Sequence, residues 1–244
     1  SVFVYLSNNE LWLKKTTFFA LGVVILQGLF GGLTVLFFLP AYISIIHAIL
    51  AQTFLLISIF IAFCLSKRNK EIINNKSNIA HLSIPAISVT ITIYIQLIIG
   101  AIMRHTESGL AIPDFPMSGG FILPLFNQAM VDAIHSMHFD AGLEFVEFYQ
   151  IIIHFAHRIG ALAVSLAIGY LSLKLFQLKI QFSIVHKLLL MMIFLLIIQI
   201  FLGAMTIWTV KNPLITSIHV LNGAIILGTS ALFILNVRPL NWIK

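Results

Sequence analysis

Six long apolar stretches are the feature that most constrains this chain. They lie at approximately Thr17–Leu39, Tyr42–Leu65, Leu82–Met103, Tyr149–Leu173, Leu188–Val210 and Leu214–Val237. Each is about as long as the roughly 20 apolar residues that a helix needs to cross a bilayer. Lipid offers no hydrogen-bond partner to an open backbone, and these Ile/Leu/Phe runs lack the alternation of barrel strands. The predicted fold class is therefore all-α, a polytopic membrane protein with six transmembrane helices.

The composition supports this class and excludes others. Of the 244 residues, 60% are hydrophobic and 9% are charged, whereas soluble domains carry about 25% charged residues. The net charge of +6 is spread over scattered residues, so we expect membrane lipid as a partner and no nucleic acid. The single cysteine, Cys64, rules out an internal disulfide and a cysteine-rich metal cluster.

The lysines and arginines predict the orientation, because cytoplasmic loops are enriched in them. If the N-terminus is cytoplasmic, 11 of the 14 basic residues face the cytoplasm. These are Lys14, Lys15, Lys67, Arg68, Lys70, Lys76, Lys174, Lys179, Lys187, Arg238 and Lys244. Arg104, Arg158 and Lys211 then lie outside or at the outer rim. Both termini are predicted to be cytoplasmic, and the long loop 104–148, with six of the eight acidic residues, to lie outside.

The sequence contains an internal repeat, in which LQGLFGGLTV from Leu26 aligns with IQIFLGAMTI from Ile198. Four pairs coincide at this offset of 172 residues: Gln27 with Gln199, Gly31 with Gly203, Thr34 with Thr206 and His47 with His219. A third copy, IQLIIGAIMR, has Gln96 and Gly100 at the same spacing. On a helix face, such a glycine permits close approach of a neighbour and the glutamine can hydrogen-bond across it. Generic packing could explain one copy, but three copies indicate a duplicated unit.

The repeat predicts the domain organisation. Residues 81–244 contain a complete four-helix bundle with the loop 104–148, whereas residues 1–80 match only the second half of such a unit. We therefore expect residues 1–80 to be the second half of an N-terminal bundle. Two more helices are expected before Ser1, with residues 1–7 as the tail of the second. The architecture would then be a pseudo-symmetric pair of four-helix bundles.

Three histidines are predicted to share a depth in the membrane. His47, His157 and His219 lie about five to eight residues inside the outer ends of their spans, or roughly 8–12 Å. Ionisable groups in membranes are usually functional, and neutral imidazole binds metals, including haem iron. A hydrogen-bonded packing role is the alternative for each. His154 is a rival ligand to His157, although Arg158 favours His157 because a guanidinium suits a haem propionate.

The other histidines receive simpler interpretations. His81 and His186 lie at cytoplasmic span ends and are predicted to be interfacial. His135 and His138 lie in the long loop and are expected at the surface, with a weak metal site as the alternative.

The long loop opens with the segment RHTESGLAIPDFP, residues 104–116. Arg104 and His105 place basic groups at a helix end, where they can face an anion at the bilayer surface. Glu107 and Asp114 can accept hydrogen bonds or protons. The glycine and the prolines of the segment predict a turn-rich path.

Three motifs together resemble those of the haem A synthase family. The first is LQGLFGGLTV in the first span, followed by a histidine in the second span. The second is RHTESGLAIPDFP at the outer end of the third span, and the third is HFAHR early in the fourth span. The resemblance covers essentially the whole chain, at the positions of the third to eighth helices of the family. It implies the two-bundle architecture that the repeat predicts.

The resemblance also implies a reaction, in which a methyl group of haem O is oxidised to a formyl group to give haem A for terminal oxidases. It implies a membrane oxidoreductase of the bacterial plasma membrane, with haem b as cofactor and substrate haem O at His47. Haem O, haem A and the haem O-making enzyme are the implied partners. The implied cofactor-binding residues are His157, His219, Arg158, Arg104 and His105.

The resemblance identifies no catalytic residue within this sequence, because the glutamate proposed as catalytic in the family lies in its first outer loop, which is expected before Ser1. The resemblance therefore implies a chain that keeps the haem b site but is not catalytically competent alone.

Two other functions compete with this one. A bis-histidine cytochrome b that only transfers electrons needs the same paired histidines. A transporter built from repeats is disfavoured, because the polar residues gather near the outer surface rather than at the midplane. The spans also lack the charged residues of an ion-coupled path.

Overall fold

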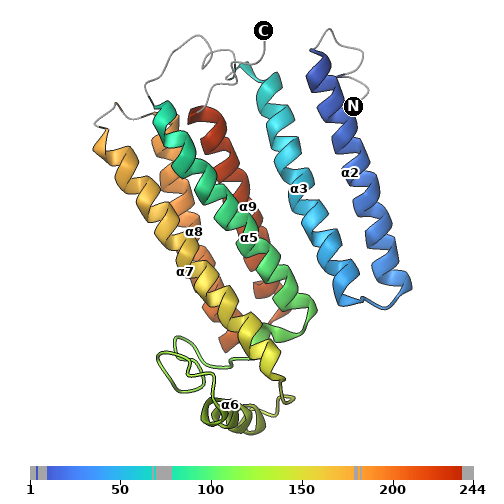
Figure 1. Ribbon diagram of the computed structural model, residues 1–244, viewed down its shortest axis with the longest axis vertical. Helices are drawn as coiled ribbons and strands as arrows, with labels where there is room; N and C mark the ends of the chain where they lie inside the picture. Colours follow the sequence, from blue (N-terminus) through green and yellow to red (C-terminus); the bar gives the residue numbers. More distant parts are fainter. Residues whose placement is uncertain are drawn as a thin grey trace.

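Six helices among the described residues are long and apolar enough to cross a membrane, as predicted (Figure 1). The computed structural model describes residues 4, 10–67, 69, 79–178, 181 and 183–237. The six helices are α2 (Leu11–Leu36), α3 (Ala41–Leu65), α5 (Ser83–His105), α7 (Phe148–Gln177), α8 (Ile184–Trp208) and α9 (Pro213–Val237). Shorter elements are the 3-10 turns η1 (Ala80–Leu82) and η2 (Ser108–Leu110), and the helix α6 (Gln128–Asp140). The all-α fold class is confirmed.

Polar caps, rather than the limits of the apolar stretches, set the starts of two helices. α7 begins behind a reciprocal capping box of Glu147 and Gln150, in which each side chain accepts a hydrogen bond from the backbone N–H of the other residue. α8 begins at Ile184, four residues before the predicted start, behind a similar box of Ser183 and His186. Hydropathy detects only the apolar part of a span, so it misses a polar first turn.

The six helices alternate in direction, as a chain that crosses a membrane repeatedly must (Figure 1). α2, α5 and α8 run toward the end that carries α6, and α3, α7 and α9 run away from it. Arg104 and Lys211 lie at the α6 end, while Lys14 and Lys174 lie near the opposite end. Several predictions lie outside the described residues: those for residues 1–3 and 5–7, Arg68, Lys70, Lys76, Lys179, Arg238 and Lys244.

Helices α5, α7, α8 and α9 form a four-helix bundle, and α3 packs against α5 and α9 (Figure 1). α2 packs on α3 at the edge of the molecule. The bundle core is fully buried and aliphatic or aromatic, with Ile168, Leu171, Met192 and Phe233 among its members. The bundle lies within the predicted unit 81–244, and the assignment of residues 1–80 to half of a second bundle stays a prediction.

The backbone confirms the internal repeat. Leu39 N–H donates to a carbonyl five residues back in α2 at 2.7 Å, and Lys211 N–H does the same to α8 at 2.8 Å. Both turns contain two consecutive left-handed residues, with φ of 56° and 61° at 38–39 and of 51° and 58° at 210–211. This is a Schellman-type helix end formed twice without glycine. The pairs α2–α3 and α8–α9 are therefore copies of one helical hairpin, with His47 and His219 each the seventh residue of its second helix.

The 104–148 loop contains a helix, α6, that the sequence analysis did not predict. α6 begins behind Asn127, whose side chain accepts a hydrogen bond from the Met130 N–H. Met130, Ile134 and His138 recur every four residues and are buried. Met130 and Ile134 join apolar residues of the preceding loop and of α7 in a small separate core. The cap residue and the four-residue spacing were the signals that could have revealed this helix.

Candidate functional site

His157 of α7 and His219 of α9 face each other in the half of the bundle nearer α6. Their ring centroids are 6.5 Å apart and the ring planes are inclined at 59°. Two metal–nitrogen bonds of about 2 Å, one from each ring, would place the centroids about 6 Å apart. The observed separation therefore fits a single metal ion shared by the two imidazoles.

Each of these rings also contacts the amide of a glutamine on a neighbouring helix. Gln96 Nε2 of α5 lies 3.1 Å from His157 Nδ1, and Gln199 Nε2 of α8 lies 3.2 Å from His219 Nε2. His219 Nδ1, Gln96 Oε1 and Arg158 Nε are among the buried polar atoms that have no hydrogen-bond partner among the described residues. Buried polar atoms seldom lack partners, so the unpaired Nδ1 of His219 indicates a place for a polar or metal-containing group beside this ring.

The structure separates His154 from His157, which the sequence left as rival ligands. His154 is buried, and its Nδ1 accepts a hydrogen bond from the Ile112 N–H at 3.2 Å. It therefore holds the 104–148 loop against α7. His157, one turn later, faces His219 instead. The geometry favours His157 as the ligand.

His47 of α3 has a different partner and is not in ring contact with this pair. Its Nδ1 lies 2.8 Å from the backbone carbonyl oxygen of Gln27, to which it can only donate. A histidine that donates from one ring nitrogen keeps the lone pair of the other available for a metal. In His47 that other nitrogen is Nε2.

Arg158 fastens the 104–148 loop to α7. Its Nη1 donates to the Met117 carbonyl at 2.6 Å. Its Nη2 donates to the carbonyls of Ile112 and Asp114 at 3.2 and 2.7 Å. The sequence analysis expected this guanidinium to face a propionate, whereas only its Nε is left without a described partner. Arg104, the other predicted anion ligand, is exposed at the end of α5.

The two acidic residues of the RHTESGLAIPDFP segment accept hydrogen bonds, the first of the two roles that the sequence allowed. Asp114 accepts from the backbone N–H groups of Gly119 and Gly120 at 2.8 and 2.7 Å. Glu107 pairs with Lys211, in the turn between α8 and α9, at 3.0 Å. The segment is therefore tied both to itself and to the second helical hairpin.

The expectation that His138 lies at the surface is wrong. Only 2% of the residue is exposed. Its Nδ1 lies 2.6 Å from the Glu144 carbonyl oxygen, and its Nε2 lies 3.1 Å from that of Leu110. The inward face of α6 buries it, and without α6 in the prediction the burial could not be foreseen. No group of three or more potential metal ligands gathers among the described residues, at His135 and His138 or elsewhere.

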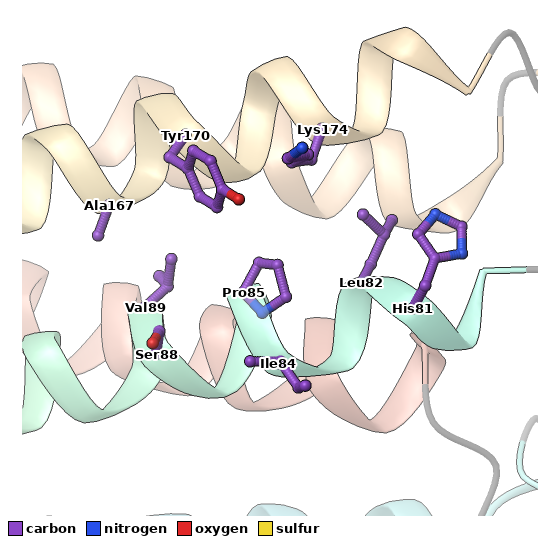
Figure 2. Close-up of a pocket in the computed structure, with 9 residues that line it drawn as sticks. All are labelled: His81, Leu82, Ile84, Pro85, Ser88, Val89, Ala167, Tyr170 and Lys174. Atoms are coloured by element: carbon purple, nitrogen blue, oxygen red, sulfur yellow. The ribbon is translucent and has the colours of Figure 1, made fainter.

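A cavity of about 410 Å³ lies apart from the histidine pair, between α5 and α7 (Figure 2). Val89 and Ala167 contribute apolar walls, and the side chains of Tyr170 and Lys174 line it from α7. Tyr170 follows His157 by 13 residues, or roughly 20 Å along the helix. The cavity is therefore not part of the histidine site.

The fold and the site together define a multi-pass helical membrane protein in which imidazoles of α7 and α9 face each other. The sequence model of the COX15-CtaA family, described as cytochrome oxidase assembly protein, matches residues 1–231. The chain belongs to this family.

Curated relatives carry the name heme A synthase. The chain is 27% identical to the one from Staphylococcus haemolyticus over 143 residues, which cover 59% of this chain and 40% of the relative. It is 29% identical to that of Rickettsia prowazekii over 134 residues, covering 54% and 36%. A longer match, with Staphylococcus saprophyticus, is 24% identical over 227 residues and covers 91% and 67%. The first two matches thus span less than half the length of these relatives.

Proposed function

We propose that this protein is a haem A synthase, a membrane oxidoreductase that oxidises a methyl group of haem O to the formyl group of haem A. The observation that carries the proposal is the opposed pair His157 and His219, with ring centroids 6.5 Å apart. Membership of the COX15-CtaA family and the names of the relatives support it. These matches do not favour the alternative of a cytochrome b that only transfers electrons.

In this proposal His157 and His219 are the two residues that would hold the iron of haem b. An iron porphyrin with two imidazole ligands supplies one-electron transfer. The chain's own residues bind and orient it: α7 and α9 carry the two imidazoles, and the glutamines of α5 and α8 contact the rings. The buried Nε of Arg158 supplies a donor for a haem carboxylate. Arg104 and His105, at the end of α5, are proposed as further basic groups for the carboxylates.

The substrate haem O is assigned to His47. Its Nδ1 bond to a backbone carbonyl orients the ring and leaves Nε2 as the ligand atom. The hairpin α2–α3 repeats α8–α9, which carries His219, and this supports an equivalent role for the two histidines. Residues 1–80 are accordingly proposed as half of the substrate-haem bundle, and residues 81–244 as the haem b bundle.

The proposed location is a bacterial plasma membrane, with both termini in the cytoplasm and α6 outside. The distribution of lysine and arginine supports this orientation. Contact with the enzyme that makes haem O is proposed as well, because haem O is too apolar to diffuse freely through water.

Cysteine labelling in intact cells tests the orientation. In a Cys64→Ser background, Ile122→Cys is expected to react with a membrane-impermeant maleimide, because residue 122 is 80% exposed in the 104–148 loop. Lys67→Cys, past the end of α3, is expected to react only after lysis. The reverse pattern would contradict the proposed topology.

The function is tested in cells that make haem O but lack their own haem A synthase. The purified protein is expected to carry haem b, and haem O or haem A in the same extract would show that the half-site at His47 holds substrate haem. Bound haem b with neither haem O nor haem A would support the cytochrome alternative. A folded protein from haem-sufficient cells that carries no haem would overturn the proposal.

A further inference from the structure

We propose that Gln96 and Gln199 are positioning residues: each holds the imidazole of the facing histidine through its side-chain amide. The proposal rests on the proposed function, in which these histidines bind haem b. The glutamines are equivalent members of the repeat, each on the helix that packs beside the histidine helix. α5 presents Gln96 to α7, and α8 presents Gln199 to α9.

The glycine one turn after each glutamine brings the ring close to the neighbouring helix. A Cβ atom on Gly100 would lie 3.1 Å from His157 Cε1, and one on Gly203 would lie 3.3 Å from His219 Cε1. The α2–α3 pair repeats this contact at 3.0 Å. These distances are shorter than an ordinary van der Waals contact. Each ring can therefore reach its glutamine only because the residue four positions after the glutamine is glycine.

A further polar residue fixes the amide of Gln199. Asn222 Nδ2 donates to Gln199 Oε1 at 2.7 Å and to the Leu195 carbonyl at 2.9 Å. Since its oxygen is engaged there, Gln199 turns its Nε2 toward His219 Nε2, 3.2 Å away. Asn222 is buried one turn after His219. The network orients the ring from both helices of the hairpin.

The side chain of Gln96 instead lies against Gly160 of α7, where the absence of a side chain leaves room for it. A Cβ atom on Gly160, one turn after His157, would overlap Gln96 Oε1. In this space Gln96 Nε2 donates to the His157 carbonyl at 2.9 Å and lies 3.1 Å from the ring Nδ1. The amide thus contacts both the backbone and the ring of the histidine that it faces.

The α2–α3 pair supplies a matched control within the same chain. His47 Nδ1 bonds the backbone carbonyl of Gln27, not its side chain. Replacing the Gln27 side chain therefore leaves this hydrogen bond in place.

The amide is chemically suited to this role. A metal-binding imidazole is normally oriented by a hydrogen bond at its second nitrogen, and loss of that partner typically costs about 10–100-fold in metal affinity. A glutamine amide offers both a donor and an acceptor. In the observed contacts the donor Nε2 faces the ring, which suits an imidazole without a metal. A metal-bound ring carries a proton on its second nitrogen, so the amide oxygen must turn toward it on haem binding, and Gln199 must then give up its bond to Asn222. Leucine has a similar size and offers neither a donor nor an acceptor.

The experiment compares Gln96→Leu, Gln199→Leu and Gln27→Leu in the full chain. In the metal-free protein, ¹⁵N NMR of labelled histidines is expected to show altered ring-nitrogen shifts for His157 in the first variant and for His219 in the second. The ring of His47 is expected to keep its shifts in Gln27→Leu. Titration with haem b is expected to be at least about tenfold weaker for the first two variants. Each is also expected to change the reduction potential of the bound haem. Gln199→Glu is expected to restore the affinity, because a carboxylate can accept both from Asn222 Nδ2 and from the N–H of a metal-bound ring.

The NMR spectra and the haem titration together distinguish a failure of the positioning role from a failure of the proposed function. If both leucine variants keep the parental ring shifts, haem affinity and potential, the positioning role is wrong and the proposed function is untouched. If the parent binds no haem, the proposed function fails, and the NMR arm still decides whether the amides hold the rings. If a leucine variant does not fold, the Gln→Glu variant, which keeps the size of the side chain but replaces the amide donor by an oxygen, decides by its shifts and potential. Shifts and potential identical to the parent would then overturn the proposal.

Discussion

Replacing His157 by glycine is expected to abolish the haem b spectrum of the purified protein. The variant removes one of two imidazoles that face each other with centroids 6.5 Å apart. Loss of a side chain that hydrogen-bonds a metal ligand already costs about 10–100-fold in metal affinity. Loss of the ligand itself is therefore expected to cost more than that. The measurement is the reduced-minus-oxidised absorption spectrum together with the haem content per protein. Added imidazole is expected to restore the spectrum, because it can occupy the space of the missing ring.

His154→Gln is the matched control on the same helix. It removes the ring that accepts from the Ile112 N–H, so the 104–148 loop is expected to exchange its amides faster with deuterated water. The haem spectrum is expected to stay close to the parental one. If His154→Gln loses the haem while His157→Gly keeps it, the ligand assignment is reversed.

Gly100→Val is expected to weaken haem b binding by more than about tenfold. This is the smallest loss of metal affinity that is typical when a metal ligand loses its hydrogen-bond partner. A Cβ atom there would lie 3.1 Å from His157 Cε1, and valine adds two further methyl groups at this point. The ring must then leave its place beside Gln96, and with it the position opposite His219. The measurement is a haem titration of the detergent-purified variant, with helix content followed by circular dichroism.

Gly169→Val, on α7, is the control for the loss of a helix glycine. No atom lies within 4 Å of the Cβ position at Gly169, so this variant is expected to bind haem as the parent does. Equal affinities for the Gly100 and Gly169 variants would show that the close ring contact does not matter for binding.

The sequence by itself determined the properties that belong to single segments or to matching segments. Apolar length is a local quantity, so the six spans were predictable, although several of their ends differ from the prediction by three to six residues. The offset of 172 residues predicted that the hairpins α2–α3 and α8–α9 are copies. Their turns indeed share the same hydrogen bonds and left-handed residues. The helix α6 was not predicted because it is short, only 13 residues, and its buried side is a single stripe of Met130, Ile134 and His138.

Only the tertiary structure decided which side chains meet. His154 and His157 differ by about 60° around α7, and that difference directs one to the loop and the other to His219. Arg158 likewise takes three loop carbonyls as partners, although its place in the sequence suggested an anion. The physical reason is that such contacts join residues far apart in the chain. They depend on how whole helices pack and where each side chain then points, which no local pattern contains.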